Sequence, residues 1–235
     1  GLQEAYRAQL GISVIHAWGM TETSPLGTMA RPISAHYGAP VERVADDLLS
    51  QGRPLFGIEV RVVGDSGLEL PWDGKSVGEL QARGNWVAAA YYNDATSPEK
   101  FKDGWLCTGD VATIDANGYV RIADRTKDLV KSGGEWISSI AIEGLIMAHP
   151  GVAEAAVIAV PHPKWDERPL ACVVSKPEAR EALTREAILD HLRPHIAKWW
   201  LPDDVVFIDQ IPKTSVGKFD KKVLRARFKD HPLPM

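Results

Sequence analysis

The sequence predicts a mixed α and β fold (α/β or α+β) in two parts, and three observations lead to this prediction. The first half contains short alternating or apolar runs bounded by turn residues, which are typical of β-strands. In the second half, helical patterns alternate with apolar strands. Charged residues replace apolar ones over residues 124–131, so we expect a boundary there, between a domain of residues 1–124 and one of residues 125–235.

The elements of the first half follow from its local patterns. Residues 1–10 have a helical pattern, and residues 13–18 form an apolar run that ends at a glycine and predicts a strand. Residues 25–52 are rich in small and breaking residues and predict an irregular segment. Three further strands, each next to a turn signal, are predicted over residues 58–63, 78–84 and 118–123.

In the second half, predicted helices alternate with predicted strands. Helices are predicted over residues 139–147, from Thr184 to about residue 195, and from Asp220 onward, with Thr184 as an amino-terminal cap. Strands are predicted over residues 152–160, 170–174 and 203–207. The adjacent Trp199 and Trp200 are expected to pack in a core or an interface.

Composition narrows the class of function. The formal net charge of −4 argues against a nucleic acid as the main partner. Residues 213–229 are an exception, with seven basic residues and one acidic residue, which fits either a solvated helix face or an anionic substrate. No apolar stretch is long enough for a membrane span and no export signal opens the chain, so a cytoplasmic protein is expected. The oligomeric state stays open, a homodimer included.

Two short motifs place a carboxylate where a nucleotide could bind. Thr21 and Glu22 follow a strand and a glycine, an arrangement that suits a phosphate and a hard ion such as Mg²⁺, or simply a helix cap. Asp110 follows the turn glycine of Thr108-Gly109-Asp110 and could accept both hydroxyls of a ribose. The alternative for Asp110 is a turn residue that bonds its own backbone.

Two further segments bear lysines and glycines. Residues 124–135 mix charges with two adjacent glycines, which fits a hinge and a loop of positive φ, although charge alternation can also serve solubility alone. Residues 211–218 put Lys218 on a Ser/Gly loop, from which it could bring a positive charge to a polyanionic transition state. A solvated loop lysine is the alternative.

In their order along the chain and in their residues, these motifs resemble those of the adenylate-forming (AMP-binding) superfamily. This superfamily includes acyl-CoA synthetases, firefly luciferase and the adenylation domains of peptide synthetases. The resemblance extends from about residue 14 to residue 227. Residues 136–139 and 160–169 are most similar to fatty-acyl-CoA synthetases. The resemblance implies that residues 1–124 are the β-rich carboxyl-terminal part of a large AMP-binding domain, and residues 125–235 a small mobile α+β domain.

The resemblance also implies roles for single residues. Thr21 would contact the adenylate phosphate, Glu22 would hold Mg²⁺, and Asp110 and Arg125 would bind the ribose hydroxyls. Lys127 would be the hinge residue. The adenine or acyl pocket would be lined by Ala17, Trp18 and Gly19. The thioester-forming face would include Lys131, Gly133, Gly134 and Glu135.

Lys218 matches the family's lysine that bridges the substrate carboxylate and the α-phosphate of ATP. In the implied reaction the carboxylate attacks the α-phosphate, pyrophosphate leaves, and Lys218 and Mg²⁺ screen the growing negative charge. The thiol of CoA attacks the acyl-adenylate after the small domain has turned. The expected cofactors and substrates are therefore ATP or AMP, Mg²⁺, CoA and a carboxylic acid, either a medium- or long-chain fatty acid or an aryl or short-chain acid.

Two features depart from the family's pattern. The Ser/Thr/Gly-rich phosphate loop that precedes the Trp18 motif in the family is absent, which we interpret as truncation at the amino end. Little or no complete turnover is therefore expected of this chain alone. Ala141 stands where relatives commonly carry an acidic residue. A non-catalytic nucleotide- or CoA-binding module, or a structural fragment, is the alternative of a different class.

Overall fold

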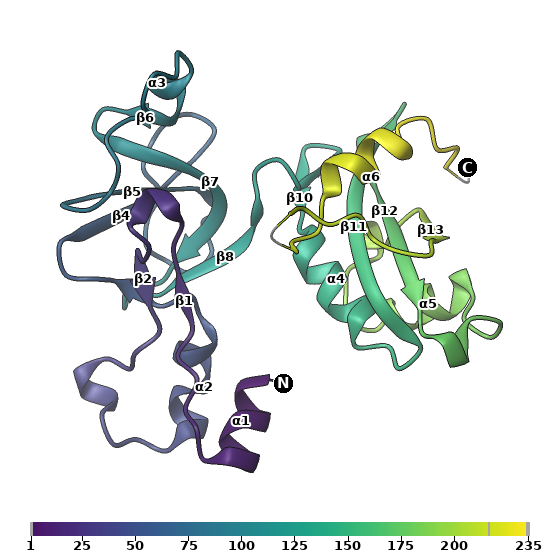
Figure 1. The fold of residues 1–235 in the computed structure, drawn as a ribbon, viewed down its shortest axis with the longest axis horizontal. Coiled ribbons are helices and arrows are strands. Elements are labelled where there is room, and N and C mark those ends of the chain that lie inside the picture. The colour runs from purple at the N-terminus through teal and green to yellow at the C-terminus, as the bar shows by residue number, and fades with distance from the viewer. Residues whose placement is uncertain (1, 216, 234–235) are drawn as a thin grey trace. The chain divides into compact units, whose positions relative to one another are not determined.

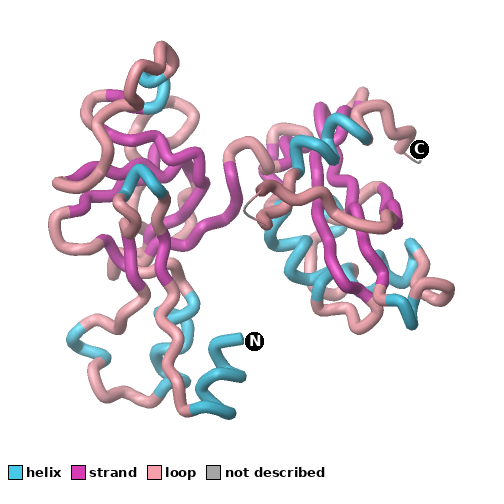
Figure 2. The backbone as a smooth tube through the Cα atoms, in the orientation of Figure 1, coloured by secondary structure: helices cyan, strands magenta, loops and turns pink. Residues whose placement is uncertain are grey.

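The computed structural model describes residues 2–215 and 217–233, so Gly1 and Val216 of the segments named above lie outside the described residues. The chain divides into two compact units, residues 1–123 (unit 1) and 124–235 (unit 2). Each unit combines helices with β-sheets that are largely antiparallel, two in unit 1 and one in unit 2 (Figure 1 and Figure 2). The mixed α and β fold class is thereby confirmed.

Unit 1 is built on two sheets. The smaller sheet has the order β1-β2-β3, with the strands Ala17–Trp18, Thr28–Met29 and Arg53–Pro54. The larger sheet has the order β4-β5-β7-β6 with β8 against β7, and its strands are Ile58–Val63, Gly78–Gly84, Trp105–Ile114, Phe101–Lys102 and Val120–Arg125. The helical segments are α1 Leu2–Leu10, η1 Thr21–Thr23, η2 Ser34–His36, α2 Val41–Leu49 and α3 Ser97–Lys100.

Strand β4 shows how the core of unit 1 forms. Successive side chains of a strand point to opposite faces, and Ile58, Val60 and Val62 are buried on one face of β4. They pack with Leu80 of β5 and with Trp18, which anchors the smaller sheet on the same core. The loop that follows Trp18 is therefore held by the core of the unit.

Four predictions for unit 1 are confirmed and two are wrong. The predicted first helix is present as α1, and the strands predicted over residues 58–63, 78–84 and 118–123 are present as β4, β5 and β8. The strand predicted over residues 13–18 is reduced to Ala17–Trp18, because Val14 and Ile15 are exposed and no described strand pairs with residues 13–16. The segment predicted as irregular contains α2, which begins directly after Pro40.

Unit 2 has one sheet with helices on both faces. The strand order is β10-β9-β12-β11, with β13 parallel to β12, and the strands are β9 Val130–Ser132, β10 Glu135–Ile137, β11 Val152–His162, β12 Asp166–Ser175 and β13 Asp204–Phe207. The helical segments are α4 Ser139–Met147, η3 Pro177–Ala179, α5 Arg185–Leu192, η4 Lys198–Trp200 and α6 Lys221–Arg227.

The long strand β11 is buried on both faces. Ala155 and Val157 belong to a core cluster that includes Ile142 of α4 and the apolar side chains of α5. Ala156 and Ile158 point the other way, into a second cluster with Leu224 of α6. Figure 1 shows α4 and α6 beside this strand. A run that is apolar except for Glu154 near its start therefore suits this strand, and this explains why the sequence predicted it.

The other predictions for unit 2 hold at the level of elements. Helix α4 occupies residues 139–147 as predicted, and the Thr184 hydroxyl caps α5 by accepting a hydrogen bond from Ala187 N at 3.2 Å. Trp200 packs against the core as expected, whereas the side chain of Trp199 is 45% exposed. Among the described helices, none has the length and apolar character needed to cross a bilayer.

Candidate functional site

The first candidate site is the loop between β1 and β2. Gly19 permits its fold, because a Cβ at this position would lie 1.9 Å from the carbonyl oxygen of Pro25. Thr23 Oγ1 accepts a hydrogen bond from Met20 N at 2.8 Å and lies 3.0 Å from the carbonyl oxygens of Met20 and Pro25. The backbone of the loop is thus fixed from within, and its conformation requires glycine at position 19.

Glu22 is oriented by a residue from a distant segment. The Tyr91 hydroxyl donates a hydrogen bond of 2.6 Å to Glu22 Oε1, and Ala88 N donates one of 2.8 Å to the carbonyl oxygen of Glu22. The hydrogen bond to Glu22, together with burial, raises the pKa of Tyr91 to about 12. Tyr91 therefore stays protonated at neutral pH and remains a donor. Thr21, next to Glu22, is exposed to solvent.

The donor set around Glu22 indicates which kind of ion would fit. The part of the chain that the structure describes contains no group of three His, Cys, Asp or Glu side chains able to hold a metal ion. Mg²⁺ commonly takes one or two protein carboxylates and completes its shell with water and substrate phosphates. Glu22, with Oε1 bonded by Tyr91, fits an ion of that kind and not a site made of protein ligands alone.

Asp110 lies inside strand β7, and its prediction as a residue that follows a turn is wrong. Leu80 of β5 alone faces the three residues 108–110, so β7 bulges there. Thr108 Oγ1 donates to the carbonyl oxygen of Leu80 at 2.6 Å and accepts from Asp110 N at 3.1 Å. Because a bulge re-aims side chains, Asp110 can reach Trp18, whose Nε1 donates to Asp110 Oδ2 at 2.8 Å.

Unit 1 brings together two of the residues predicted for nucleotide binding, Trp18 and Asp110, whereas Arg125 belongs to unit 2. Trp18 and Asp110 are both buried and in direct contact. The side chain of Trp18 belongs to the core, where it holds Asp110. The remaining predicted residues of this unit lie on β1 or on the loop that follows it, namely Ala17, Gly19, Thr21 and Glu22.

The second candidate site is the β9–β10 hairpin of unit 2. Gly133 has φ +60°, donates its N–H to the carbonyl oxygen of Trp165 at 2.8 Å, and has the Trp165 ring 2.9 Å from where a Cβ would stand. Lys131 N donates to Glu167 Oε2 at 2.9 Å, and its ammonium lies 4.6 Å from the centre of the Trp136 ring. The positive-φ loop predicted for this segment is present, and Gly134 also has a positive φ of +87°.

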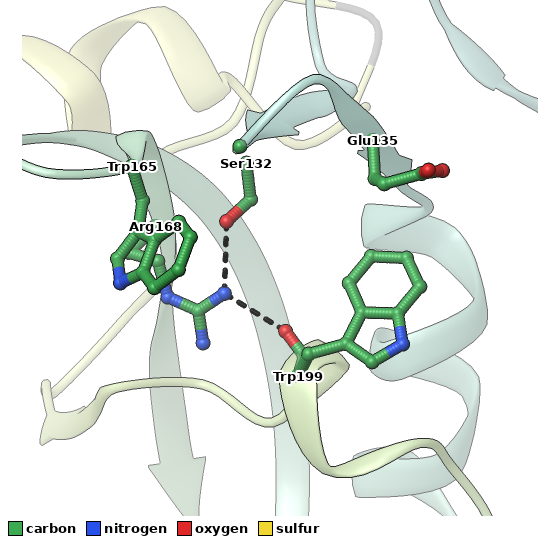
Figure 3. A pocket seen from close by; sticks show the side chains of 6 residues that line it. Ser132, Glu135, Trp165, Arg168 and Trp199 are labelled. Carbon is green, nitrogen blue, oxygen red and sulfur yellow. Dashed lines mark hydrogen bonds between the residues drawn. The ribbon is translucent and has the colours of Figure 1, made fainter.

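This hairpin borders a pocket of about 430 Å³ (Figure 3). The side chains of Trp165 and Trp199 stand on either side of the Arg168 guanidinium in that view, and Arg168 Nη1 donates to Ser132 Oγ at 2.9 Å. The lining residues are Ser132, Gly133, Glu135, Trp165, Arg168 and Trp199. This aromatic pocket thus has two tryptophan side chains and a buried cation in its wall.

Residues 125–129 form a turn within unit 2. Asp128 N and Leu129 N both donate to the carbonyl oxygen of Arg125, at 2.8 and 3.0 Å. Each end of the turn is tied down: Asp124 Oδ2 accepts from Ser139 N at 2.5 Å, and Asp128 Oδ1 pairs with an arginine of α6 at 2.6 Å. Arg125 and Lys127 lie on the exposed part of this turn.

Lys218 lies in a tight loop before α6. Thr214 N donates to the carbonyl oxygen of Lys218 at 2.7 Å, and Lys218 N reaches Thr214 Oγ1 at 3.3 Å. The Lys218 side chain is exposed, and no carboxylate of the residues described pairs with it. An ammonium without an internal partner is available to an anionic ligand.

Several of the basic side chains of residues 213–229 are held in ion pairs within unit 2. Lys213 pairs with Glu154 at 2.5 Å, and Arg225 takes part in the ion pair with Asp128. The 2.6 Å pair of Lys221 with Glu143 is largely buried, and burial raises the pKa of Glu143 although Lys221 opposes the shift. Three of the seven cations therefore stabilise unit 2, which favours a structural role for much of this segment.

Comparison with protein families matches both units. The description "AMP-binding enzyme" fits residues 1–92, and "AMP-binding enzyme C-terminal domain" fits residues 141–218. The chain belongs to the AMP-binding enzyme family. The family assignment agrees with the resemblance drawn from the motifs.

Individual members of the AMP-binding enzyme family are similar over nearly all of this chain. A 3-methylmercaptopropionyl-CoA ligase from Ruegeria lacuscaerulensis is 48% identical over 96% of this chain and 41% of its own length. A medium-chain-fatty-acid–CoA ligase from Ectopseudomonas oleovorans is 44% identical over 94% of this chain and 40% of its own length. The chain thus spans about two fifths of the length of the curated relatives it matches.

Solved structures of the family are also similar over nearly all of this chain. ATP-bound MatB from Rhodopseudomonas palustris is 35% identical, with a TM-score of 0.82 over 97% of this chain and 43% of that chain. The o-succinylbenzoate CoA synthetase of Bacillus subtilis in complex with its acyl-adenylate intermediate is 29% identical, with a TM-score of 0.82 over 100% of this chain and 44% of that chain.

The motifs of this member of the AMP-binding enzyme family did not reveal the residues that support its candidate sites. Thr23, Tyr91 and Arg168 act through hydrogen bonds to the loop after β1, to Glu22 and to Ser132. Thr23 could have been found from its spacing, because a hydroxyl three residues after Met20 can accept from the Met20 N–H as in a helix cap. Tyr91 lies 69 residues from Glu22, and Arg168 lies 36 residues from Ser132. No local sequence pattern could therefore predict these two contacts.

Proposed function

We propose that the protein is an ATP-dependent acyl-CoA ligase, which activates a carboxylic acid as acyl-adenylate and transfers the acyl group to CoA. The observation that carries the proposal is the arrangement in unit 1, where the buried Trp18–Asp110 contact fixes a carboxylate beside a loop that presents Thr21 and Glu22. The acyl-CoA ligase names of the relatives support the same class of reaction.

In the first step, the carboxylate oxygen of the acid bonds to the α-phosphorus of ATP and the bond to pyrophosphate breaks. Asp110 accepts the ribose hydroxyls, assisted by Arg125, and the Thr21 hydroxyl donates to a phosphate oxygen. Lys218 places its ammonium against the charge that grows on the α-phosphate. A bound Mg²⁺ ion would supply further screening of phosphate charge, and Glu22 would hold it.

In the second step, the thiol sulfur of CoA bonds to the acyl carbon, the bond from that carbon to the AMP phosphate oxygen breaks, AMP leaves and the thiol proton passes to water. The β9–β10 hairpin supplies this face, with Lys131, Gly133, Gly134 and Glu135. Gly133 and Gly134 both have positive φ, and no side chain projects from either position to obstruct the pantetheine arm. Unit 2 would turn about Lys127 between the steps.

A fatty acid of medium or long chain is the proposed acyl substrate, in line with the 44% identity to fatty-acid–CoA ligases. A short acid is the second candidate, because the two 3-methylmercaptopropionyl-CoA ligases are 48% and 47% identical. A panel of short, medium, long and aryl acids, assayed for acyl-CoA with the complete protein, separates these candidates by kcat/KM.

The two half-reactions test the proposed role of Lys218. Removing one such electrostatic contact typically costs about 10²–10³-fold in rate, so Lys218→Ala should lower acid-dependent ATP–pyrophosphate exchange by that factor. Thioester formation from supplied acyl-adenylate should be spared. Lys222→Ala, which removes an exposed lysine of α6, is the matched control and should leave both half-reactions unchanged. An equal loss of both in Lys218→Ala would argue against its role in adenylation.

A ligand titration tests the alternative, in which the chain is a nucleotide- or CoA-binding module without catalysis. Isothermal titration of the chain with an acyl-adenylate analogue should show binding that Asp110→Ala removes. Binding without acyl-CoA formation by the complete protein would favour the module. A wild-type chain that binds neither AMP nor the analogue would leave only a structural role.

A further inference from the structure

Arg168 of β12 connects the two sides of the aromatic pocket. Arg168 is 9% exposed, and Asp203 Oδ1 lies 2.8 Å from Nε and 2.6 Å from Nη2. Nη1 donates to Ser132 Oγ at 2.9 Å and to the carbonyl oxygen of Trp199 at 2.8 Å, and Nη2 donates to that of Leu201 at 3.0 Å. Arginine has five N–H donors; four of those of Arg168 make these hydrogen bonds, and the second contact with Asp203 is an ion pair.

On the hairpin side, Arg168 contacts Ser132, which lies among the residues proposed for the thioester-forming face. Ser132 stands between Lys131 and Gly133, and its hydroxyl is turned toward Arg168 in Figure 3. On the opposite wall, Arg168 holds the backbone of Trp199 and not its ring, so the ring stays exposed. The distance between the hairpin and the Trp199 segment is therefore set by one planar group.

We propose that Arg168 is a positioning residue for the thioester-forming step, which sets the affinity for CoA by fixing the β9–β10 hairpin against the Trp199 segment. The proposal rests on the proposed function. Arg168 itself touches no substrate, since the hydrogen bonds and the ion pair of its guanidinium all lie within unit 2. Its effect is transmitted by Ser132 on one side and by the Trp199 backbone on the other.

The geometry requires arginine and not merely a positive charge. Lysine has three donors on a compact ammonium, whereas the arginine fork spans acceptors on separate segments. Arg168→Lys keeps the ion pair with Asp203 within reach but cannot also satisfy Ser132, Trp199 and Leu201. A buried acceptor left without its donor is costly, so the hairpin and the Trp199 segment should separate or loosen while the unit stays folded.

The test compares Arg168→Lys, Ser132→Ala and their double variant in the complete protein. Each single variant should raise KM for CoA about tenfold in thioester formation from supplied acyl-adenylate, with ATP–pyrophosphate exchange and KM for ATP unchanged. Because both act through one contact, the double variant should show far less than the product of the two effects. Arg180→Lys alters an exposed arginine of unit 2 and should change neither half-reaction.

Amide hydrogen exchange gives a readout that does not depend on activity. Exchange at Gly133 and Gly134 should be at least tenfold faster in Arg168→Lys than in the wild type, and unchanged in Arg180→Lys. If Arg168→Lys left both the exchange and KM for CoA unchanged, or slowed both half-reactions equally, the proposal would be overturned. A wild type that forms no acyl-CoA from any acid would refute the proposed function, whereas the exchange rates still report whether Arg168 fixes the hairpin.

Discussion

The hydrogen bond between Trp18 and Asp110 gives the first candidate site its form. It joins two buried side chains over 2.8 Å, and one of them is a carboxylate. Hydrogen bonds to charged groups contribute about 1.5–3 kcal/mol to stability, more than those between neutral groups. The bond therefore both stabilises unit 1 and fixes the orientation of the carboxylate proposed to bind ribose.

Trp18→Phe tests this contribution. The variant keeps an aromatic ring but loses the Nε1 donor, so the free energy of unfolding should fall by about 2 kcal/mol or more, since the smaller ring also leaves a gap in the core. Urea unfolding measures the change. Trp72→Phe, at a side chain that is 40% exposed, should stay within about 0.5 kcal/mol of the wild type. A similar small change in both variants would contradict the role given to Trp18.

Single residues were predictable where their neighbours in sequence define them. Asp110 was singled out because threonine and glycine precede it, and Gly133 because a second glycine follows it. The partner of Asp110 lies 92 residues away on β1, and only the bulge in β7 brings the two together. A contact that depends on sheet register at such a distance leaves no trace in a local pattern.

At the scale of elements, helix α4 contains a glycine that serves no evident purpose. Gly144 lies in the interior of the helix, and a Cβ there would meet nothing within 4 Å. Glycine in a helix interior is less stable than alanine by about 0.5–1 kcal/mol because it loses more conformational freedom on folding. The helix thus forms through its caps and its buried face, despite this residue.

Gly144→Ala should raise the free energy of unfolding by about 0.5–1 kcal/mol. Gly134→Ala is the matched comparison, because its Cβ would also meet nothing within 4 Å but its φ is +87°. Alanine at positive φ costs about 1–2 kcal/mol, so this variant should be destabilised. Chemical unfolding of both variants measures the opposite signs, and two changes of the same sign would show that backbone conformation does not control them.

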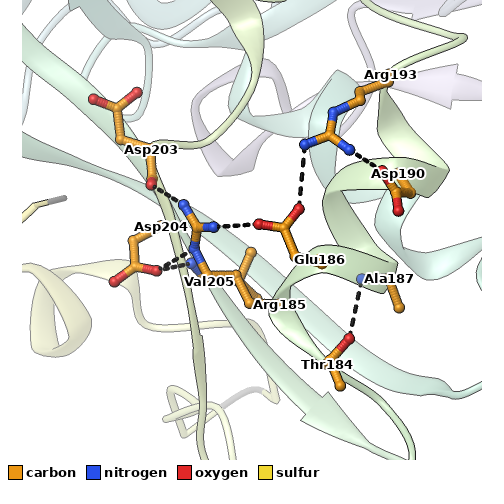
Figure 4. Close-up of polar contacts among 9 residues, drawn as sticks. All are labelled: Thr184, Arg185, Glu186, Ala187, Asp190, Arg193, Asp203, Asp204 and Val205. Atoms are coloured by element: carbon orange, nitrogen blue, oxygen red, sulfur yellow. Dashed lines mark hydrogen bonds and ion pairs between the residues drawn. The ribbon is translucent and has the colours of Figure 1, made fainter. Parts of the chain in front are cut away.

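Asp204 of β13 pairs with Arg185 of α5 (Figure 4) and with His231, which follows α6. Burial acts to raise the pKa of this carboxyl, but hydrogen bonds from His231, from Val205 N and from Arg185 outweigh it and lower the pKa. His231 Nε2 and Arg185 Nε each lie 2.8 Å from a carboxylate oxygen of Asp204. The charged carboxylate is therefore the form that stabilises the folded protein.

The sign of the shift predicts a dependence on pH. A lowered carboxyl pKa gives stability that is present above the ordinary aspartate pKa of about 3.9 and is lost as the pH falls through the lower folded value. Asp204→Asn should therefore be less stable than the wild type at neutral pH, with a difference that shrinks in acid. Urea midpoints across this range measure it. Asp209→Asn, at an exposed carboxylate, should show a small difference at neutral pH.

Elements were predicted where one physical requirement governs the whole segment. Strand β11 needs apolar residues on both faces, so its run is unmistakable in the sequence. Strand β7 was missed because its bulge places glycine and two polar residues in the middle of the strand. Helix α2 was missed because the prolines and glycines around it favoured an irregular segment.

At the scale of the whole molecule, the candidate residues are shared between the two units. Thr21, Glu22 and Asp110 belong to unit 1, whereas Lys218 and the β9–β10 hairpin both belong to unit 2. Under the proposed function, unit 2 has to supply Lys218 for adenylation and the hairpin for thioester formation. The sequence could predict this division of labour only through the family resemblance, because no pattern within one segment encodes a motion between two.

Lys127→Pro tests where that motion takes place. Proline fixes φ near −65° and pushes the preceding residue toward an extended conformation, so rotation about residue 127 should be impeded. We expect one half-reaction to slow at least tenfold while the other is retained, as measured by ATP–pyrophosphate exchange and by thioester formation from supplied acyl-adenylate. Lys127→Ala leaves the backbone free and should retain both.

The alternative pivot lies between Ala123 and Asp124, just before the turn of residues 125–129. Asp124 and Asp128 hold both ends of residues 125–127 within unit 2, so a rotation at Lys127 has to open the bonds that Asp128 N and Leu129 N make to Arg125. Rotation between Ala123 and Asp124, where the two units divide, would leave these bonds intact. If Lys127→Pro slowed neither half-reaction, the pivot would belong there, and unit 2 would turn with its residues 124–129 as one body.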